Sequence, residues 1–281
     1  MDLLSPRIYA KLLSPNSHLI INFKEIKEEM KEYINKNNIN ASIYVENLRS
    51  GAFFEINASQ SYPVASLNKL PLSILILKKV EEGKLSLNDE IDIMIEDRND
   101  YFGELYKNPI GKLSVKELLY YMLVDSDNTA TNVLEGLVKK EDLDSLEEYI
   151  NFYCNDIISE KAPLKTTEAN PQNISNIFIS LYLSTILEPN YSELILDYLS
   201  NNSFDIKKYA NLPESVTVSH KHGLQYTDNK KFFHDCGILY IGESRFCYCI
   251  MTKGIELEKT NEVIGKIVNM IYKFILEKRK K

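Results

Sequence analysis

The sequence is poor in several features that would assign it quickly to a class of protein. It has no tryptophan, and its aromatic bulk comes from 18 tyrosines and 11 phenylalanines. No run of about 18 apolar residues occurs, which argues against a membrane-spanning helix. The net charge is −7, and the only basic run is the terminal Lys278-Arg279-Lys280-Lys281, so a nucleic-acid partner is not expected.

Cysteine is also scarce, with Cys154, Cys236, Cys247 and Cys249 alone in 281 residues. Neither a Cys-x-x-Cys nor a His-x-x-x-His spacing is present, so we predict no metal site and no cofactor. Cys247 and Cys249 share one face of a predicted strand, where they are too far apart and too nearly parallel to bond to each other. We therefore interpret the cysteines as small buried apolar side chains, which leaves the cellular compartment undetermined.

The first residues carry no recognisable export signal. Residues 1–21 contain two prolines, Pro6 and Pro15, and no continuous apolar segment. Either the protein stays inside the cell or the given chain begins after an export segment has been removed, and the sequence leaves both open. We predict that residues 1–22 form an N-terminal extension to the folded part.

Apolar periodicity divides the rest of the chain into three parts. Residues 23–36 have helical spacing, and residues 41–45 and 53–56 alternate as in a β-hairpin. A helical part follows, with helices predicted at residues 66–83, 115–123, 130–138, 174–186 and 191–199. Strands return at residues 215–220, 236–241 and 246–251, and an amphipathic helix over residues 261–276 ends the pattern.

This order predicts an α+β fold with two lobes. Strands from both ends of the chain can form one antiparallel five-stranded sheet, flanked by the two terminal helices. We assign residues 23–62 and 210–281 to this sheet lobe and residues 63–209 to an all-helical lobe.

One short motif opens the helical part. Ser66 and Lys69 stand three residues apart, a spacing that places both side chains on one face of a helix. A serine hydroxyl is a weak nucleophile unless a neighbouring base takes its proton, and a lysine amine at this spacing is within reach. Taken alone, the pair fits a helix N-cap and a solvated charge equally well.

Two further motifs follow in the chain. Ser126-Asp127-Asn128 lies between two predicted helices, and Lys221-His222-Gly223 ends a predicted strand. Alone, the first fits an N-cap cluster and the second an ordinary strand end. In this order, with Ser66-x-x-Lys69 before them, the three motifs match the pattern of penicillin-recognising serine enzymes. From about residue 43 onward the chain resembles the class A β-lactamase-like family of serine hydrolases and the related DD-peptidases.

The resemblance implies a fold and a reaction. Residues 23–281 would form one β-lactamase-like domain. Ser66 would attack a carbonyl carbon and become acylated, with Lys69 orienting or deprotonating it. Ser126 would pass a proton to the leaving nitrogen, and the N–H groups of Ser66 and Leu224 would form an oxyanion hole.

The same resemblance implies the substrate contacts. Asn128 would hold the substrate amide, and Lys221 would attract a substrate carboxylate and lower the pKa of Lys69 by its charge. His222 and Gly223 would complete the edge of the site. Tyr101 stands where relatives have an aromatic pocket wall, although a core tyrosine is equally compatible. His220 and His222 flank Lys221; we expect one of the two to face the cleft, and the family offset selects His222.

The chain departs from the family pattern in the third motif. His222 replaces the usual threonine or serine, whose hydroxyl helps to bind the substrate carboxylate. Imidazole is larger and changes charge near neutral pH, so we expect altered substrate shape or pH-dependent affinity. Cys236 stands where relatives often have an arginine, which leaves Lys230 or Lys231 as the alternative anionic anchor.

A second departure concerns the release of the acyl group. Class A β-lactamases carry a Glu-x-x-x-Asn loop, but Glu160 has no asparagine four residues later. Glu160 as a substitute base and Glu160 as a solvated charge both remain open.

We predict a serine hydrolase of β-lactams, with a DD-carboxypeptidase or esterase and a non-turnover β-lactam sensor as alternatives. The expected partner is a β-lactam or a D-Ala-D-Ala-type peptide, the expected state is a monomer, and the family expectation is export.

Overall fold

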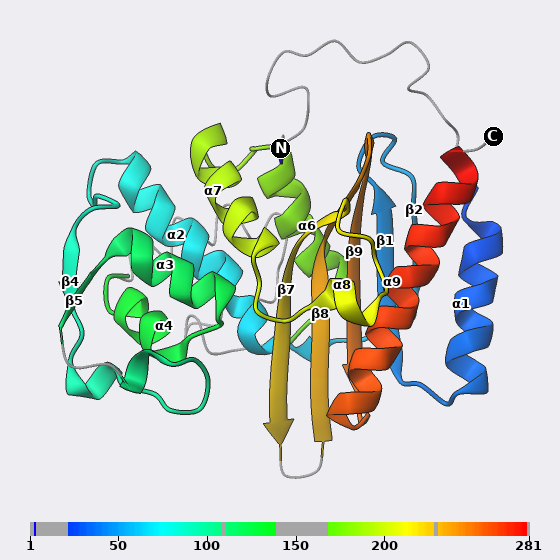
Figure 1. The fold of residues 1–281 in the computed structure, drawn as a ribbon, viewed down its shortest axis with the longest axis horizontal. Coiled ribbons are helices and arrows are strands. Elements are labelled where there is room, and N and C mark those ends of the chain that lie inside the picture. The colour runs from blue at the N-terminus through cyan, green and yellow to red at the C-terminus, as the bar shows by residue number, and fades with distance from the viewer. Residues whose placement is uncertain (1–2, 4–21, 108–110, 139–167, 228–229, 280–281) are drawn as a thin grey trace.

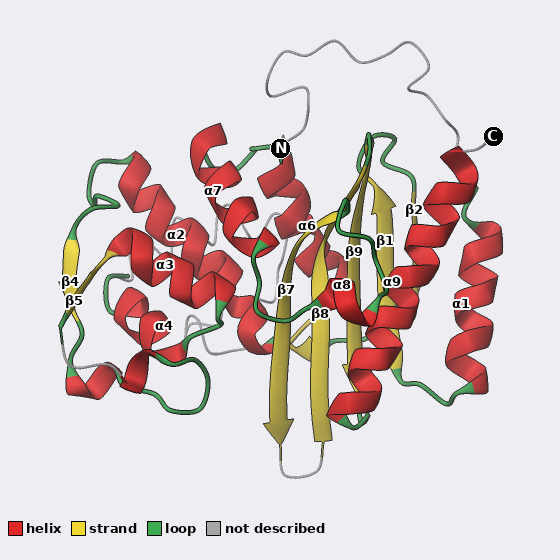
Figure 2. Ribbon diagram, in the orientation of Figure 1, coloured by secondary structure: helices red, strands yellow, loops and turns green. Residues whose placement is uncertain are grey.

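The computed structural model describes residue 3 and residues 22–107, 111–138, 168–227 and 230–279. Five strands form one antiparallel sheet, confirming the predicted α+β fold (Figures 1 and 2). Its spatial order is β2 (Phe53–Ile56), β1 (Ala41–Asn47), β9 (Ser244–Lys253), β8 (Lys230–Ile241) and β7 (Thr217–Thr227). Strands from the two ends of the chain therefore meet at β1 and β9, and β7 forms one edge.

The two terminal helices pack against one face of this sheet. Helices α1 (Lys24–Lys36) and α9 (Leu257–Arg279) run side by side at the right of Figure 1, and the short α8 (Ile206–Tyr209) packs against α9. The apolar stripe of α1 repeats at helical spacing, and its members Ile26, Met30 and Ile34 are buried. Burial of this face in one apolar cluster with β1, β8 and β9 stabilises the pairing of distant chain segments.

The opposite side of the molecule is mainly helical. α6 packs against β8 and β9, and the remaining helices lie beyond the β7 edge or beside it (Figure 1). The helices of this part are α2 (Lys69–Glu81), α3 (Val115–Val124), α4 (Asn128–Glu135), α6 (Pro171–Tyr182) and α7 (Pro189–Ser200). Every residue of α2 from Lys69 to Leu77 is buried, because this helix is apolar nearly all round. None of the described helices is both long and apolar enough to cross a bilayer.

Short elements connect these helices, and apart from η2, which falls at the start of the helix predicted from Ser66, they were not predicted. β3 (Tyr62–Pro63) pairs with β6 (Glu168–Ala169), and β4 (Glu90–Asp92) pairs with β5 (Lys112–Ser114). In the described residues, 3₁₀ turns occur at η2 (Ala65–Asn68), η3 (Ile95–Asp97) and η4 (Leu105–Lys107). Segments of two to four residues are too short to show a periodic apolar pattern, so only the folded chain reveals them.

The interpretation of the cysteines was wrong for one pair. Cys236 and Cys249 form a disulfide between β8 and β9, where they stand directly opposite each other. Cys247 and Cys249 lie within one strand, whereas the bond between Cys236 and Cys249 depends on the register between two strands. Cys247 is a buried free thiol, as expected, and Cys154 lies outside the described residues.

Candidate active site

A cavity of about 380 Å³ lies where η2, the start of α2, α4 and the edge strand β7 come together. Ser66, Lys69, Asn128 and His222 all line it, although they come from distant parts of the chain. Their convergence follows from the fold, because β7 is the sheet edge that packs against η2. Such a concave site with a few polar groups is the usual form of a small-molecule site.

The Ser66–Lys69 pair lies on the turn between η2 and α2. In a 3₁₀ turn residues three apart are nearly eclipsed, and Lys69 Nζ lies 3.2 Å from Ser66 Oγ. The amine also contacts the Ser126 carbonyl oxygen at 2.7 Å, Ser126 Oγ at 3.2 Å and Asn128 Oδ1 at 2.8 Å. Both carbonyl oxygens accept only. A neutral amine donates its two hydrogens to them and keeps its lone pair for a hydroxyl hydrogen.

The protonation of Lys69 is set mainly by its burial. The side chain is 2% exposed, and burial lowers its pKa to about 7. The negative charges of Asp127 and Glu135 oppose this decrease. A large fraction of the amine is therefore neutral near pH 7, which a general base requires.

The backbone on both sides of this amine is in the left-handed region. Ala65, directly before Ser66, has φ of 50°, and Ser126 has φ of 56°. Residues other than glycine rarely adopt these backbone angles, and such strain is typical of functional sites. Asp127 supports the second position: it caps α4 by accepting from Ala130 N–H at 2.9 Å and accepts from Leu105 N–H at 2.9 Å.

The structure also places the predicted substrate-binding residues of the first two motifs. Asn128 begins α4 and lines the cavity, with its Oδ1 held by Lys69. Tyr101 lines the cavity as well and is 63% exposed, so it is a wall residue rather than a core tyrosine. Of the described residues, none forms a group of three suited to binding a metal ion.

The third motif lies on β7, but its members have different surroundings. Leu224 and His222 line the cavity. A Cβ on Gly223 would stand 3.0 Å from the Val64 carbonyl oxygen, so glycine allows β7 to approach η2 closely. Lys221 is fully buried beside the cavity and is not among its lining residues.

The Lys221 amine has no hydrogen-bond partner among the described residues. Burial lowers its pKa well below the ordinary value, and the positive charge of Lys69 lowers it further. Asp235 and Asp125 act in the opposite direction. The charge of Lys69 thus acts on Lys221, whereas the predicted effect of Lys221 on the pKa of Lys69 is not among the causes of the Lys69 shift, and the Lys221 amine does not reach the cavity surface.

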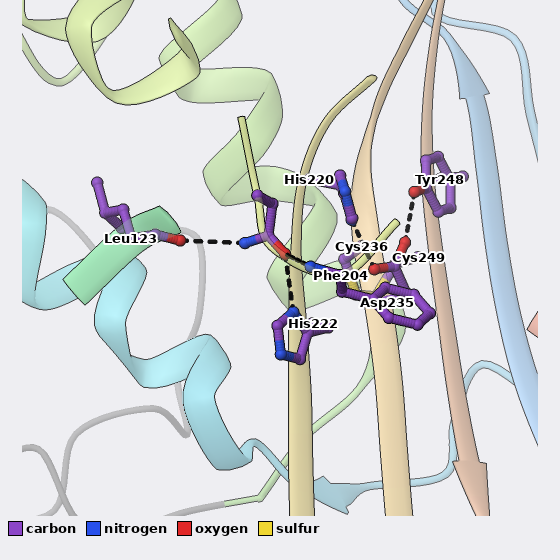
Figure 3. A network of polar contacts seen from close by, with 9 residues as sticks. Leu123, Phe204, His220, His222, Asp235, Cys236, Tyr248 and Cys249 are labelled. Atoms are coloured by element: carbon purple, nitrogen blue, oxygen red, sulfur yellow. Dashed lines mark hydrogen bonds and ion pairs between the residues drawn. A yellow bond between two sulfur atoms is a disulfide. The ribbon is translucent and has the colours of Figure 1, made fainter. Parts of the chain in front are cut away.

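The two histidines of β7 share one face of the strand, because they are two residues apart. Both rings pack against Phe204, with the ring centroids 6.1 Å apart for His220 and 5.4 Å apart for His222. His220 pairs with the buried Asp235, Nδ1 to Oδ2, at 2.7 Å. His222 lines the cavity, and its Nδ1 lies 2.9 Å from Asn202 Oδ1 (Figure 3).

Three residues that contribute to this arrangement were missed in the sequence, and for two of them the sequence carries no signal. Asn202 and Asp235 lie 20 and 15 residues from the histidines that they contact, and only the folded chain brings them together. Glu135 lines the cavity from the last turn of α4. The periodicity placed this helix at residues 130–138, and the spacing from Asn128 to Glu135, two helical turns, could have identified it as a residue of the same face.

The alternative anchors considered for the missing family arginine do not line the cavity. Cys236 is in the disulfide, and Lys231 pairs with Glu256. Neither Lys230 nor Lys231 lines the cavity. Glu160 lies outside the described residues.

Comparison with known proteins agrees with this geometry. The model of the family described as "Beta-lactamase enzyme family" matches residues 25–275, which is most of the chain. The chain belongs to the β-lactamase enzyme family. This confirms the resemblance drawn from the three motifs and makes the protein a serine β-lactamase-like hydrolase.

Two curated members of the β-lactamase family are distant in sequence but are matched over most of their length. Beta-lactamase VEB-1 of Pseudomonas aeruginosa is 22% identical over 270 residues, 87% of each chain. Extended-spectrum beta-lactamase PER-1 of the same species is 23% identical over 243 residues, 79% of this chain and 78% of the relative.

Solved structures show the same fold. The extended-spectrum β-lactamase TLA-3 superposes with a TM-score of 0.81 at 18% identity, covering 90% of this chain and 99% of that one. PBP-A superposes with a TM-score of 0.77 at 22% identity, covering 90% and 97%. At these identities the likeness concerns the fold, and the roles of individual residues are argued from the site itself.

Proposed function

We propose that the protein hydrolyses β-lactams through an acyl-enzyme formed on Ser66. The observation that carries this proposal is the Lys69 amine, which lies 3.2 Å from the Ser66 hydroxyl inside a cavity and has a pKa of about 7. Two carbonyl acceptors hold the amine in place, so its lone pair is oriented rather than free to rotate.

Acylation then follows from the arrangement. Ser66 Oγ attacks the lactam carbonyl carbon while its proton passes to Lys69 Nζ, and an oxyanion forms. The N–H groups of Ser66 and Leu224 are the proposed donors to that oxyanion. The carbon–nitrogen bond breaks, and the nitrogen takes a proton from Ser126 Oγ, which Lys69 replenishes across 3.2 Å. Asn128 and Tyr101 are the proposed substrate contacts.

Release of the acyl group needs a base for water. Among the described residues that line the cavity, Glu135 is the one carboxylate, and it follows Asn128, Thr131 and Asn132 on one face of α4. The negative charge of Glu135 raises the pKa of the Lys69 amine, so the carboxylate is close enough to act on the proposed reacting groups. We assign water activation to Glu135: it takes a proton from water as the hydroxide adds to the ester carbonyl carbon. The bond from that carbon to Ser66 Oγ then breaks, and Oγ regains a proton through Lys69, which the protonated Glu135 replaces.

Intact mass spectrometry after mixing with benzylpenicillin tests both steps. The wild-type protein gains the mass of the intact penicillin and returns to its free mass as product forms. The Ser66→Ala variant gains no mass. The Glu135→Gln variant gains it at least as fast as the wild type, because the charge that opposes the neutral Lys69 amine is gone, and loses it about 100-fold or more slowly. Glu193→Gln, on α7 and not among the cavity-lining residues, is the matched control and follows the wild type.

Equal adduct formation in the Ser66→Ala variant would refute acylation at Ser66. Equal release in the Glu135→Gln variant would refute only the assignment of the base.

Two alternatives keep the same nucleophile. A mutant of PBP-A, a distant structural neighbour, has been solved as an acyl-enzyme complex with penicillin G, and a regulatory protein, BlaB of Streptomyces cacaoi, is 25% identical over 118 residues. A lasting adduct on the wild-type protein would favour a non-turnover sensor. Release of D-alanine from a D-Ala-D-Ala peptide would favour a peptidase.

We further propose a monomer with a sheet lobe of residues 23–62 and 210–281 and a helical lobe of residues 63–209.

A further inference from the structure

The side-chain amide of Asn202 is fixed in one orientation. Its Nδ2 donates to the Leu123 carbonyl oxygen at 3.0 Å, and its Oδ1 accepts from the Phe204 N–H at 3.1 Å (Figure 3). Turning the amide over would set a carbonyl against a carbonyl and an N–H against an N–H. Two backbone groups therefore determine which atom of Asn202 faces β7.

This orientation determines the tautomer of His222. The atom that faces His222 Nδ1, at 2.9 Å, is the Asn202 oxygen, which can only accept. Nδ1 must therefore carry a hydrogen. In a neutral imidazole the second nitrogen, Nε2, then has a lone pair and no hydrogen. No described residue donates to Nε2, and the ring lines the cavity.

The surroundings keep the ring neutral. The rings of Phe204, Phe233 and Phe102 pack around His222, with centroids 5.4, 6.1 and 6.0 Å away. Burial lowers the pKa of His222 well below its ordinary value, and the positive charges of Lys221, His220 and Lys69 lower it further.

The carboxylate on the neighbouring strand does not offset these positive charges. Asp235 is directly opposite His222 in the register of β7 and β8, but it accepts hydrogen bonds from His220 and Tyr248 instead.

We infer that His222 presents a hydrogen-bond acceptor to the cavity. The site therefore prefers substrates that place an uncharged hydrogen-bond donor, such as a carboxamide, next to His222 over substrates that place a free carboxylate there. This inference rests on the proposed function, because the substrate is the one that acylates Ser66. A carboxylate has only lone pairs to set against Nε2, whereas an amide N–H donates to it.

The charges at the cavity surface favour the same choice. Lys69 is the one lysine or arginine among its described lining residues, and its amine already faces two carbonyl oxygens and two hydroxyls. Lys221 is fully buried, and Glu135 adds a negative charge. An anionic group would therefore enter a site with little unpaired positive charge at its surface.

A matched pair of chromogenic cephalosporins tests the inference. One carries the free carboxylate on the ring next to the lactam, and the other carries a primary carboxamide at that position. We expect kcat/KM of the wild-type protein to be about tenfold or more higher for the carboxamide, which corresponds to about 1.4 kcal/mol. Both kcat/KM values are measured at one pH, so the protonation of Lys69 affects them equally and cancels in their ratio.

Two variants separate the role of the imidazole from a general effect. His222→Thr supplies a hydroxyl that can donate, and we expect it to shift the ratio about tenfold toward the carboxylate. Asn201→Ala changes the exposed neighbour of Asn202, whose amide contacts Asp197 and Ser200 instead, and we expect the wild-type ratio. Equal use of both substrates by the wild type, or preference for the carboxylate, would overturn the inference.

Nitrogen-15 NMR of histidine-labelled protein reads the tautomer without turnover, the His222 signals being assigned by their loss in His222→Thr. We expect Nδ1 protonated and Nε2 unprotonated; the opposite result overturns the inference. If neither cephalosporin acylates Ser66, the proposed function fails, and titration with acetamide and acetate then decides the inference. Acetamide should shift the Nε2 resonance and acetate should not. A larger shift with acetate than with acetamide would contradict the inference.

Discussion

The regions around the two buried lysines, Lys69 and Lys221, differ in how completely they satisfy an amine. Lys69 Nζ has the Ser66 hydroxyl, two groups of Ser126 and the Asn128 amide oxygen around it. Lys221 Nζ, on β7, has no hydrogen-bond partner in the part of the chain that the structure describes. A satisfied amine contributes to holding its region together, whereas an unsatisfied one lowers the stability of the fold. The first lysine therefore stabilises the region that contains it, and the second lowers the stability of its own region.

The largest effect is expected from removing the Lys69 amine. In Lys69→Met the side chain keeps a similar length, but Ser66 loses its base, so acylation should slow about 100- to 10,000-fold. The Ser126 carbonyl and Asn128 Oδ1 also lose their donor, which should reduce the free energy of unfolding by about 1–3 kcal/mol. Stopped-flow acylation and urea denaturation measure the two effects. A decrease in acylation of less than tenfold would mean that another group takes the proton.

A smaller effect is expected from protonating Lys69 instead of removing it. Its pKa of about 7 means that the amine is largely protonated below that pH and largely neutral above it. The acylation rate should therefore fall about tenfold for each pH unit below the pKa and level off above it. The measurement is the single-turnover rate from about pH 5 to about pH 9. A rate that is constant across this range would remove Lys69 from the role of base.

The smallest effect, and the one of opposite sign, is expected at Lys221. Lys221→Met replaces an unpartnered buried amine with an apolar side chain, so the free energy of unfolding should rise by about 1–3 kcal/mol. Because the pKa of Lys221 is lowered in the folded state, the unfolded chain binds more protons and wild-type stability rises with pH. The gain from Lys221→Met should therefore shrink as the pH approaches the pKa of a free lysine. Urea denaturation at two pH values checks this, and a loss of stability would show that the amine has a partner.

The sequence was most informative where chemistry depends on neighbours in the chain. The spacing of Ser66 and Lys69 predicted a contact that the structure gives as 3.2 Å, although on a 3₁₀ turn before α2 rather than inside it. Long amphipathic elements such as residues 261–276 were found with the correct type, and their ends were extended by the structure to Leu257–Arg279. Periodicity reports one buried face, and these elements have one.

The sequence was least informative where a property depends on packing between distant segments. The orientation of Asn202 depends on Leu123 and Phe204, and no spacing relates the three. The Cys236–Cys249 disulfide required the register of β8 against β9. That Lys221 lacks a partner among the described residues is a property of its whole surroundings, and the motif Lys221-His222-Gly223 carries no trace of it.

Helix α2, buried from Lys69 to Leu77, sets how this protein can lose activity. Segments with little buried apolar surface open locally at small cost, whereas an interior helix opens only when most of the molecule does. The lysine of the proposed catalytic pair begins this helix, and the serine lies on the turn that leads into it. Fraying of the chain ends or of surface loops should therefore leave the nucleophile in register with its base. Inactivation by heat should coincide with global unfolding, without a folded, inactive state between the two.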